Sequence, residues 1–313
     1  KKNMMYIFER KYFMKKIFIL GSLNIDLSIS CDLFPIPGET VIGKDFFSNP
    51  GGKGANQAVA AAKAGGNVIM LGAVGKDSFG KQLKNNLKKV KVNTKYVVTK
   101  ECPTGVAIII VNDKNNRIIL DTGANYCYEY ADFERILMKL AKPGDYLITQ
   151  LENKIEVVKE GLALAKKLKM ITVLNPAPAL PLDDQILQNC DYFIPNENES
   201  YVISNLHSQK IEDLVEYFLN KGVKNVIITL GEQGCVFNDG SKVNYMKAKK
   251  VNVVDTTAAG DTFIGSLVAK LAENNSLESA LNYANVASAI AITRQGAQQS
   301  IPTKKEVEEY LKN

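Results

Sequence analysis

A carboxylate follows a run of small residues near the C-terminal end of the chain. Asp261 comes directly after Thr256, Thr257, Ala258, Ala259 and Gly260. We expect Val251–Val254 to form a strand leading into this turn, and the apolar spacing from Phe263 to Leu271 predicts a helix after it. The free N–H groups of that helix start would bind an anion. A carboxylate there can deprotonate a hydroxyl that attacks a phosphoryl group, although an ordinary helix-capping Asp is the alternative.

A second segment places polar residues among glycines at the start of a helix predicted over 52–65. Its residues are Gly51, Gly52, Lys53, Gly54, Ala55 and Asn56. It is not a Walker A phosphate loop, because Gly54 stands where Ser or Thr is required. It is not a dinucleotide fingerprint either, because Gln57 replaces the last glycine. The glycines would instead let the backbone approach a small polyol.

Asn24 and Asp26 follow the first predicted strand, Ile17–Leu20. Ligands of open α/β sheets bind beyond the carboxyl ends of the strands, where this pair could hold sugar hydroxyls. A turn Asn followed by a turn Asp is the alternative.

The composition limits the class of protein. The 313 residues are 46% hydrophobic and 23% charged, and the net charge of +6 comes mostly from scattered lysines. The sequence has no dense basic stripe of the kind that would indicate a nucleic-acid partner, and no apolar run is long enough to cross a membrane. The five cysteines form no C-x-x-C pair and are dispersed, as is typical of a reducing cytosol. The single histidine, His207, is expected in a surface loop, which excludes a Ser–His mechanism.

Strand and helix signals alternate along most of the chain, which predicts an α/β fold with a mostly parallel sheet and helices on its faces. The expected strands are 17–20, 68–71, 146–149, 171–174, 192–195 and 226–229. The expected helices are 52–65, 80–88, 155–168, 211–220, one from Thr262 onward, and 277–293.

Two segments interrupt this alternation with strands that have no helix between them. The first segment contains strands expected over Leu27–Cys31 and Thr40–Phe47. The second contains strands expected over Gly105–Val111 and Ile118–Asp121, with a turn signal at 113–116 between them. We expect a small separate sheet from about 25–48 and 104–122, acting as a lid over the site, as an oligomer face, or as both. Residues 1–13 precede Met14 and are interpreted as an N-terminal extension, either native or non-native, to a domain over 14–313.

The two glycine-containing segments resemble the two signatures of the ribokinase/PfkB family of carbohydrate kinases. Further matches are Gly21–Asp26, Pro37–Thr40, Asn175–Ala179 and Thr293–Ser300, so that the resemblance covers about residues 15–311. It implies a ribokinase-like three-layer α/β/α sandwich with a mostly parallel central sheet and a small antiparallel β-lid.

The resemblance also implies an activity. This is the ATP-dependent phosphorylation of D-ribose at O5, which gives D-ribose 5-phosphate and ADP. The enzyme would be cytoplasmic and a homodimer through the lid, with no nucleic-acid or membrane partner. One alternative is another sugar or nucleoside kinase of the family, such as a deoxyribokinase. The other is a sugar- or nucleotide-sensing module without catalysis.

The resemblance also assigns the family's site residues to individual positions of this sequence. Asp261 matches the catalytic base, and the anion hole matches the backbone amides of Ala258, Ala259, Gly260 and Asp261. The sugar-binding positions are Asn24, Ile25, Asp26, Gly52, Lys53, Gly54, Ala55, Asn56, Glu152 and Asp261. The ATP-binding positions are Asn196, Thr229, Leu230, Gly231, Glu232, Gln233, Gly234, Gly260, Asp261 and Asn285.

Two ions are implied in addition. A monovalent cation, usually K⁺, would be held by Asp255, Thr257, Ala291, Arg294, Gly296 and Ser300, mostly through backbone carbonyls. Glu199 would position Mg²⁺ through water, although Asn196-x-x-Glu199 also fits a helix cap with its first-turn Glu. Asn285 stands where some family members have a His near the adenine.

Overall fold

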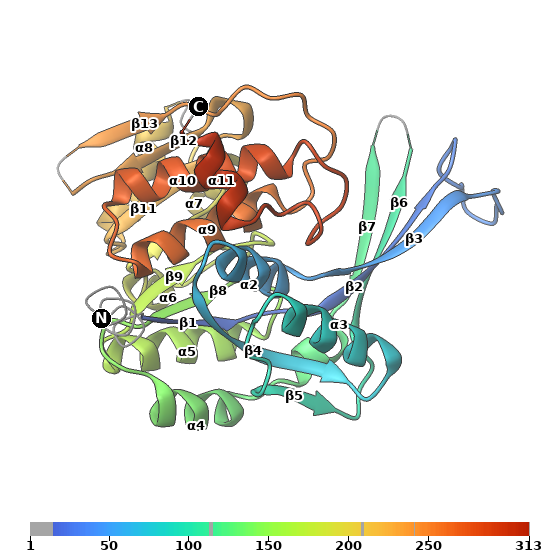
Figure 1. The fold of residues 1–313 in the computed structure, drawn as a ribbon, viewed down its shortest axis with the longest axis horizontal. Helices are drawn as coiled ribbons and strands as arrows, with labels where there is room; N and C mark the ends of the chain where they lie inside the picture. The colour runs from blue at the N-terminus through green and yellow to red at the C-terminus, as the bar shows by residue number, and fades with distance from the viewer. Residues whose placement is uncertain (1–14, 113–114, 208–209, 241, 313) are drawn as a thin grey trace, which may run out of the picture.

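A large central sheet organises the fold. The computed structural model describes residues 15–112, 115–207, 210–240 and 242–312, and within these ranges nine strands form the sheet in the order β13-β12-β11-β10-β9-β8-β1-β4-β5 (Figure 1). The expected extension at 1–13 and Asp113 and Lys114 of the expected turn lie outside the described residues.

The strands of this sheet are parallel from β11 to β5, and β12 and β13 add an antiparallel hairpin at the other edge. Their bounds are β1 (Lys16–Leu20), β4 (Asn67–Gly75), β5 (Val97–Lys100), β8 (Tyr146–Thr149), β9 (Ile171–Leu174), β10 (Tyr192–Phe193), β11 (Asn225–Thr229), β12 (Cys235–Asn238) and β13 (Val243–Met246).

Both faces of the sheet are covered by helices. In β1, Ile17 and Ile19 pack into one core cluster while Phe18 and Leu20 pack into the other, because successive side chains point to opposite faces. The first cluster includes side chains of α2 (Lys53–Lys63), α3 (Ser78–Lys89), α9 (Ala259–Ala272), α10 (Leu277–Ala291) and α11 (Lys304–Tyr310). The second includes those of α4 (Tyr130–Leu140), α5 (Ile155–Lys167), α6 (Asp184–Gln188), α7 (Glu197–Ser204) and α8 (Ile211–Asn220). The predicted three-layer α/β/α sandwich is confirmed.

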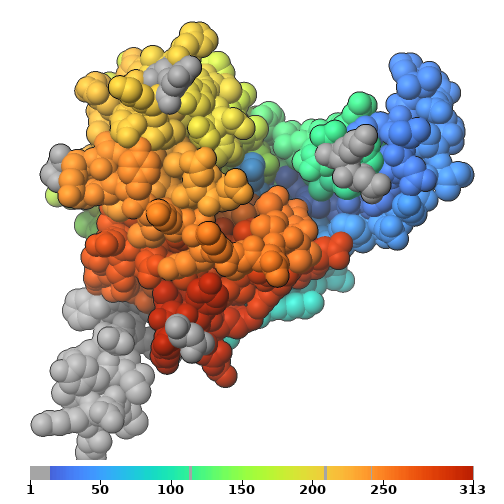
Figure 2. Space-filling view, turned by 90° about the horizontal axis from the view of Figure 1, so that it is seen from above, coloured from blue at the N-terminus to red at the C-terminus, as the bar shows by residue number. Residues whose placement is uncertain are grey.

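A second, smaller sheet projects from the main body (Figures 1 and 2). Its strands are β2 (Asn24–Ser30), β3 (Lys44–Gly51), β6 (Gly105–Val111) and β7 (Asn116–Asp121), in the order β3-β2-β6-β7. Each hairpin pairs antiparallel, whereas β2 and β6, which join the hairpins, pair in parallel. Figure 2 shows a recess between this sheet and the yellow and orange segments of the main body.

The prediction of a strand over Val251–Val254 is wrong. This segment is irregular, and Val253 and Val254 are 59% and 63% exposed. The Val254 N–H donates to the Ile292 carbonyl rather than to a neighbouring strand. A β-branched run predicts a strand only where a sheet edge is available to pair with it.

Other features of the sequence are clear in the structure. His207 is exposed and lies in an irregular segment, as expected. A disulfide joins Cys102 to Cys127, which the dispersed cysteine spacing did not predict, while Cys31, Cys190 and Cys235 are free and buried. Among the residues described, no helix combines the length and apolarity needed to span a bilayer.

Candidate active site

Polar side chains gather beyond the carboxyl ends of the parallel strands. Ser22 follows β1, Glu152 follows β8, Asn175 follows β9, Asn196 follows β10, and Thr229 ends β11. This edge is where open α/β sheets bind their ligands. Asn24 belongs to β2, so the expected pair after the first strand lies at the start of the small sheet rather than in a turn.

Asp261 lies in the first turn of α9 but does not cap it. The cap is Ala258, which has a left-handed backbone at φ 59° and no side-chain capping bond. Asp261 is 7% exposed, and its carboxylate accepts a hydrogen bond at each oxygen, from Asn56 Nδ2 at 3.0 Å and from Gln57 Nε2 at 2.9 Å. The capping interpretation is therefore wrong, and the carboxylate faces α2 instead.

The start of α9 is fixed from a second direction. The Ser288 hydroxyl of α10 donates to the Ala259 carbonyl at 3.0 Å. Ala258, Ala259 and Gly260, the predicted anion-hole residues, form the cap and the first two positions of the helix. The first amides of a helix have no partner within it, although the Ala259 N–H donates to the Thr256 carbonyl of the preceding turn at 3.2 Å. This end of α9 suits an anion beside Asp261.

Glu152 contacts two of the other predicted sugar-binding residues, Asn24 and Lys53, and also Ser22. Its Oε2 accepts from the backbone N–H of Lys53 at 3.1 Å, from the Ser22 hydroxyl, and at 3.5 Å from Asn24 Nδ2. Ser22 is a site residue that sequence reasoning missed, although it lies in the matched segment Gly21–Asp26.

The charged groups of the site influence one another. Burial, followed by the negative charges of Glu152 and Asp261, raises the pKa of Asp26 from 3.8 to about 7. Burial alone would lower the pKa of Lys53, but Asp261 and the other carboxylates around it raise that pKa above its usual value. Burial also raises the pKa of Glu199, against the opposing effects of its backbone hydrogen bond and of Lys53. The structure therefore brings the predicted acidic residues and Lys53 within electrostatic reach of one another.

Gly52 allows the glycine segment to approach the small sheet. It caps α2 at φ +88°, a conformation that L side chains rarely adopt. A Cβ at this position would lie 2.8 Å from the backbone nitrogen of Asn24. The remaining residues of the predicted set, Ile25, Gly54 and Ala55, are buried beside these.

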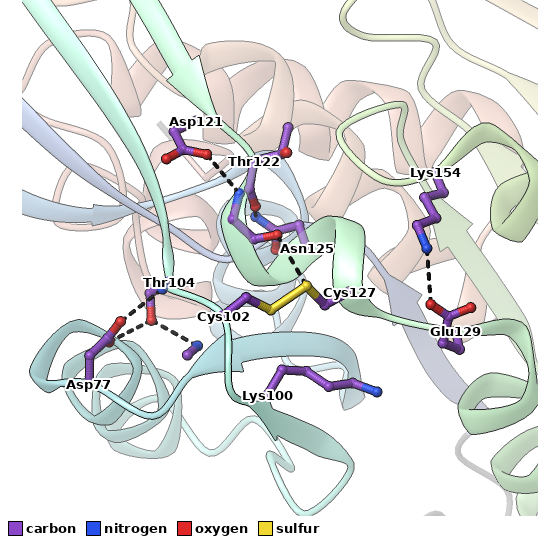
Figure 3. Close-up of a disulfide and its surroundings, with 12 residues drawn as sticks. Asp77, Lys100, Cys102, Thr104, Asp121, Thr122, Asn125, Cys127, Glu129 and Lys154 are labelled. Atoms are coloured by element: carbon purple, nitrogen blue, oxygen red, sulfur yellow. Dashed lines mark hydrogen bonds and ion pairs between the residues drawn. A yellow bond between two sulfur atoms is a disulfide. The ribbon is translucent and has the colours of Figure 1, made fainter.

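Asn125 orients the Asn24 side chain. It lies in the short 3₁₀ helix η1 (Gly123–Cys127), and its Oδ1 accepts from the Leu23 N–H at 2.9 Å. Its Nδ2 donates to Asn24 Oδ1 at 2.7 Å, so the donor end of Asn24 is left for Glu152 and the site. Figure 3 shows Asn125 close to the Cys102–Cys127 disulfide, which joins the segments before β6 and after β7. Asn125 was not predicted, because its partners lie about a hundred residues away.

The predicted nucleotide residues form a second group. Asn196 and Glu199 make a reciprocal capping box at the start of α7, so the helix-cap interpretation of this pair holds. Asn196 also bridges to Thr229, and the Leu230 N–H closes a turn on the Gly234 carbonyl at 2.8 Å. That turn exposes Gly231, Glu232 and Gln233. Asn285 is buried in α10, and its Nδ2 donates to the Lys247 carbonyl at 2.7 Å.

The residues predicted to hold a monovalent cation lie on two segments that Asp255 ties together. Its carboxylate accepts from the Thr257 N–H at 2.8 Å, from the Thr257 hydroxyl at 2.6 Å and from the Gly296 N–H at 2.8 Å. The Ser300 hydroxyl donates to the Ala297 carbonyl at 2.8 Å. The Arg294 guanidinium instead pairs with Glu306 at 2.6 Å, so Arg294 offers this group only its backbone.

These elements define an α/β kinase of the carbohydrate type. Residues 14–304 match the pfkB family carbohydrate kinase model, and the chain therefore belongs to the pfkB family of carbohydrate kinases. Among its relatives, the chain is 38% identical to a ribokinase of Haemophilus influenzae over 304 residues, which cover 96% of this chain and 99% of that protein.

Solved structures agree with this assignment. The crystal structure of ribokinase from Thermotoga maritima has a TM-score of 0.87 and 36% identity, and covers 96% of this chain and 100% of that one. The structure of Arabidopsis thaliana ribokinase complexed with ribose and ATP has a TM-score of 0.86 at 27% identity, with 96% and 99% covered. The protein is therefore a carbohydrate kinase with a ribokinase fold.

Proposed function

We propose that this carbohydrate kinase transfers the γ-phosphoryl group of ATP to O5 of D-ribose, giving D-ribose 5-phosphate and ADP. The single observation that carries the proposal is the position of Asp261. Its carboxylate lies at the N-terminal end of α9 and is hydrogen-bonded to Asn56. It is also close to Asp26 and Glu152, whose carboxylates can accept hydrogen bonds from sugar hydroxyls. Ribokinases of similar sequence and fold, one of them complexed with ribose and ATP, support the choice of both substrates.

Asp261 is the proposed base. It removes the proton from the sugar 5-hydroxyl as that oxygen attacks the γ-phosphorus in line and the bond to the ADP oxygen breaks. The backbone amides of Ala258, Ala259, Gly260 and Asp261 receive the negative charge that spreads over the transferring group. Asn24, Asp26, Lys53, Asn56 and Glu152 hold the sugar hydroxyls and aim the 5-hydroxyl at the carboxylate.

The proposed ATP site lies beside the sugar site. Asn196, Asn285 and the 229–234 turn would bind the nucleotide, and Glu199 would position Mg²⁺ through water. Glu199 fits this role, because its carboxylate is partly buried within electrostatic reach of Lys53 and Asp261. When bound, Mg²⁺ would supply positive charge that offsets the negative charge of the phosphates.

A monovalent cation, with K⁺ proposed, suits the two segments joined by Asp255. Both segments offer oxygen donors from carbonyls, hydroxyls and one carboxylate, which is the donor set that hard cations prefer. Because Asp255 lies a few residues before Ala258, a cation there would order the start of α9.

We also propose that the small sheet closes over the sugar and pairs with a second copy of the chain. Leu27, Ile108 and Ile119 are directly opposite one another across β2, β6 and β7, and Ile108 and Ile119 are 44% and 65% exposed. An exposed apolar stripe of this kind marks an interaction surface. A cytoplasmic location is proposed from the dispersed cysteines, which form no C-x-x-C pair.

ADP release tests the function directly. We would assay the full chain with D-ribose, 2-deoxyribose, fructose and adenosine, each with Mg²⁺ and with K⁺ or Na⁺. Turnover with ribose that K⁺ stimulates is the expected result. Preference for 2-deoxyribose would instead indicate a deoxyribokinase. Binding of ATP without turnover on any acceptor would contradict the kinase proposal and indicate a sensor.

A further inference from the structure

Two series of hydrogen-bonded, buried side-chain amides end at Asp261, one at each carboxylate oxygen. On one side, Gln150 Nε2 donates to Gln57 Oε1 at 2.6 Å, and Gln57 Nε2 donates to Asp261 Oδ1 at 2.9 Å. On the other side, Gln298 Nε2 donates to Asn56 Oδ1 at 3.1 Å, and Asn56 Nδ2 donates to Asp261 Oδ2 at 3.0 Å. Each carboxylate oxygen therefore receives an amide donor from a different chain of contacts.

The direction of the Gln57 amide is fixed by its neighbours. Its Nε2 also donates to Asn175 Oδ1 at 3.1 Å, and Asn175 has its own Nδ2 committed to the Ile194 carbonyl at 3.0 Å. A flipped Gln57 would turn its oxygen toward two other oxygens, those of Asp261 and Asn175, and its Nε2 toward the Nε2 of Gln150. The donor end of Gln57 is therefore held against the Asp261 carboxylate.

Close packing of two helices lets consecutive residues of α2 reach the same carboxylate. Gly265 of α9 lies against α2, where a Cβ would collide with the Gln57 carbonyl and lie 2.6 Å from the Ala60 Cβ. With α9 this close, Asn56 and Gln57 bind the two oxygens of one Asp261 side chain. Two donors on different oxygens define the plane of the carboxylate as well as its position.

We propose that Gln57 is a positioning residue for phosphoryl transfer, which sets the orientation of the Asp261 carboxylate without contacting the sugar. Gln57 is 0% exposed, so it is not available to a ligand, whereas Asn56 on the same helix is 6% exposed and belongs to the proposed sugar site. The inference rests on the proposed role of Asp261 as base. Loss of this orientation lowers kcat, because a base displaced from the attacking hydroxyl transfers its proton less efficiently.

The test compares Gln57→Met with Gln150→Met in the full chain. Both substitutions remove a buried amide from the same chain of contacts, and Gln150 is 1% exposed, but only Gln57 donates to Asp261. For Gln57→Met we expect kcat to fall on the order of 10- to 100-fold with the KM for ribose and for ATP within about 2-fold of the wild type. For Gln150→Met we expect a change in kcat of less than about 3-fold. Crystal structures of both variants should show the Asp261 carboxylate rotated in Gln57→Met only.

Three results would decide against the inference. An equal loss of kcat in both variants would assign the effect to general damage to the network. A rise in KM without a loss of kcat in Gln57→Met would place Gln57 in sugar binding. An unmoved Asp261 carboxylate in the Gln57→Met structure would overturn the positioning role whatever the kinetics. Failure of the proposed function is separate, since wild-type protein would then phosphorylate no acceptor, while the carboxylate position still decides whether Gln57 orients it.

Discussion

Each carboxylate oxygen of Asp261 accepts one amide donor and keeps a further lone pair, so the side chain is held in place and can still accept a proton. Replacing it in Asp261→Asn removes the base but keeps the size of the side chain. We expect kcat to fall about 10²- to 10⁴-fold, with the affinities for ribose and ATP largely kept. Single-turnover kinetics and calorimetric binding would measure the two effects separately.

The matched control for this variant is Asp184→Asn, which neutralises a carboxylate of α6 that pairs with Lys221 at the surface. Its kcat should equal that of the wild type. Turnover by Asp261→Asn at the wild-type rate would remove Asp261 from the mechanism.

The raised pKa of Asp26 predicts pH-dependent sugar binding. With a pKa of about 7 in the sugar-free protein, Asp26 is largely protonated at pH 6 and ionised at pH 8. The ionised form accepts hydrogen bonds from sugar hydroxyls, so the Kd for ribose at pH 6 should be about 10-fold higher than at pH 8. Isothermal titration calorimetry across this range, with Asp26→Asn as a variant that should bind weakly and without this dependence, measures the effect. A Kd for the wild type that is constant with pH would contradict it.

The raised pKa of Asp26 also makes the free energy of unfolding depend on pH. The folded protein binds the Asp26 proton more tightly than the unfolded chain, since the pKa is about 7 rather than 3.8. The contribution of Asp26 to the free energy of unfolding is therefore largest below pH 3.8 and declines as the pH rises to about 7.

At the scale of residues, spacing and family resemblance predicted the polar groups that belong to contiguous motifs. They did not predict Ser22, Gln57 and Asn125 as parts of the site. Gln57 was noticed only as the residue that breaks a dinucleotide fingerprint. Its partners Gln150, Asn175 and Asp261 come from three other parts of the chain, and only the folded sheet brings them together.

The junction of α2 with the small sheet depends on Gly52. In Gly52→Ala, the Cβ would lie 2.8 Å from the backbone nitrogen of Asn24, in addition to the strain of φ +88°. Gly240→Ala is the matched control, because Gly240 has a similar φ of +90° but nothing within 4 Å of the added Cβ. We expect Gly52→Ala to lower the free energy of unfolding by about 1–3 kcal/mol more than Gly240→Ala does.

Urea denaturation measures this difference, and the KM for ribose should rise only in Gly52→Ala, because the displaced β2 carries Asn24 and Asp26. Equal losses of stability in the two variants would show that backbone strain alone matters at Gly52.

At the scale of elements, the strongest patterns predicted the central fold closely. The expected strands 146–149 and 171–174 and the helix 211–220 coincide with β8, β9 and α8. The strands β5, β12 and β13 were missed. β5 and β13 are short edge strands whose mixed burial gives no clear hydrophobic period. β12 lies between β13 and β11 and is buried throughout, but its four residues include only two strongly apolar ones, Val236 and Phe237. The helix α11 was also missed, although Thr303 and Glu306 form a capping box that its sequence carries.

At the scale of the whole molecule, the small sheet has more apolar surface than an isolated lid requires. Leu33, Ile36, Ile42 and Phe46, in and before β3, are all at least 65% exposed, and Ile119 is exposed on β7. A second copy of the chain, covering this sheet with its own, would bury these side chains and hold β2 in place over the sugar.

Substitution of the apolar stripe tests this arrangement. We expect wild-type protein to have twice the 34.4 kDa mass of one chain by light scattering, and Ile119→Lys to have the mass of one chain, because a buried lysine without a partner opposes association. Met138→Lys is the control, since Met138 is 63% exposed on α4, away from the small sheet (Figure 1). The monomeric variant should keep its fold and bind ribose more weakly, since Asn24 and Asp26 lie on β2, the strand that a second copy would support. A wild type of single-chain mass would overturn the dimer, and a dimeric Ile119→Lys would move the interface to another surface.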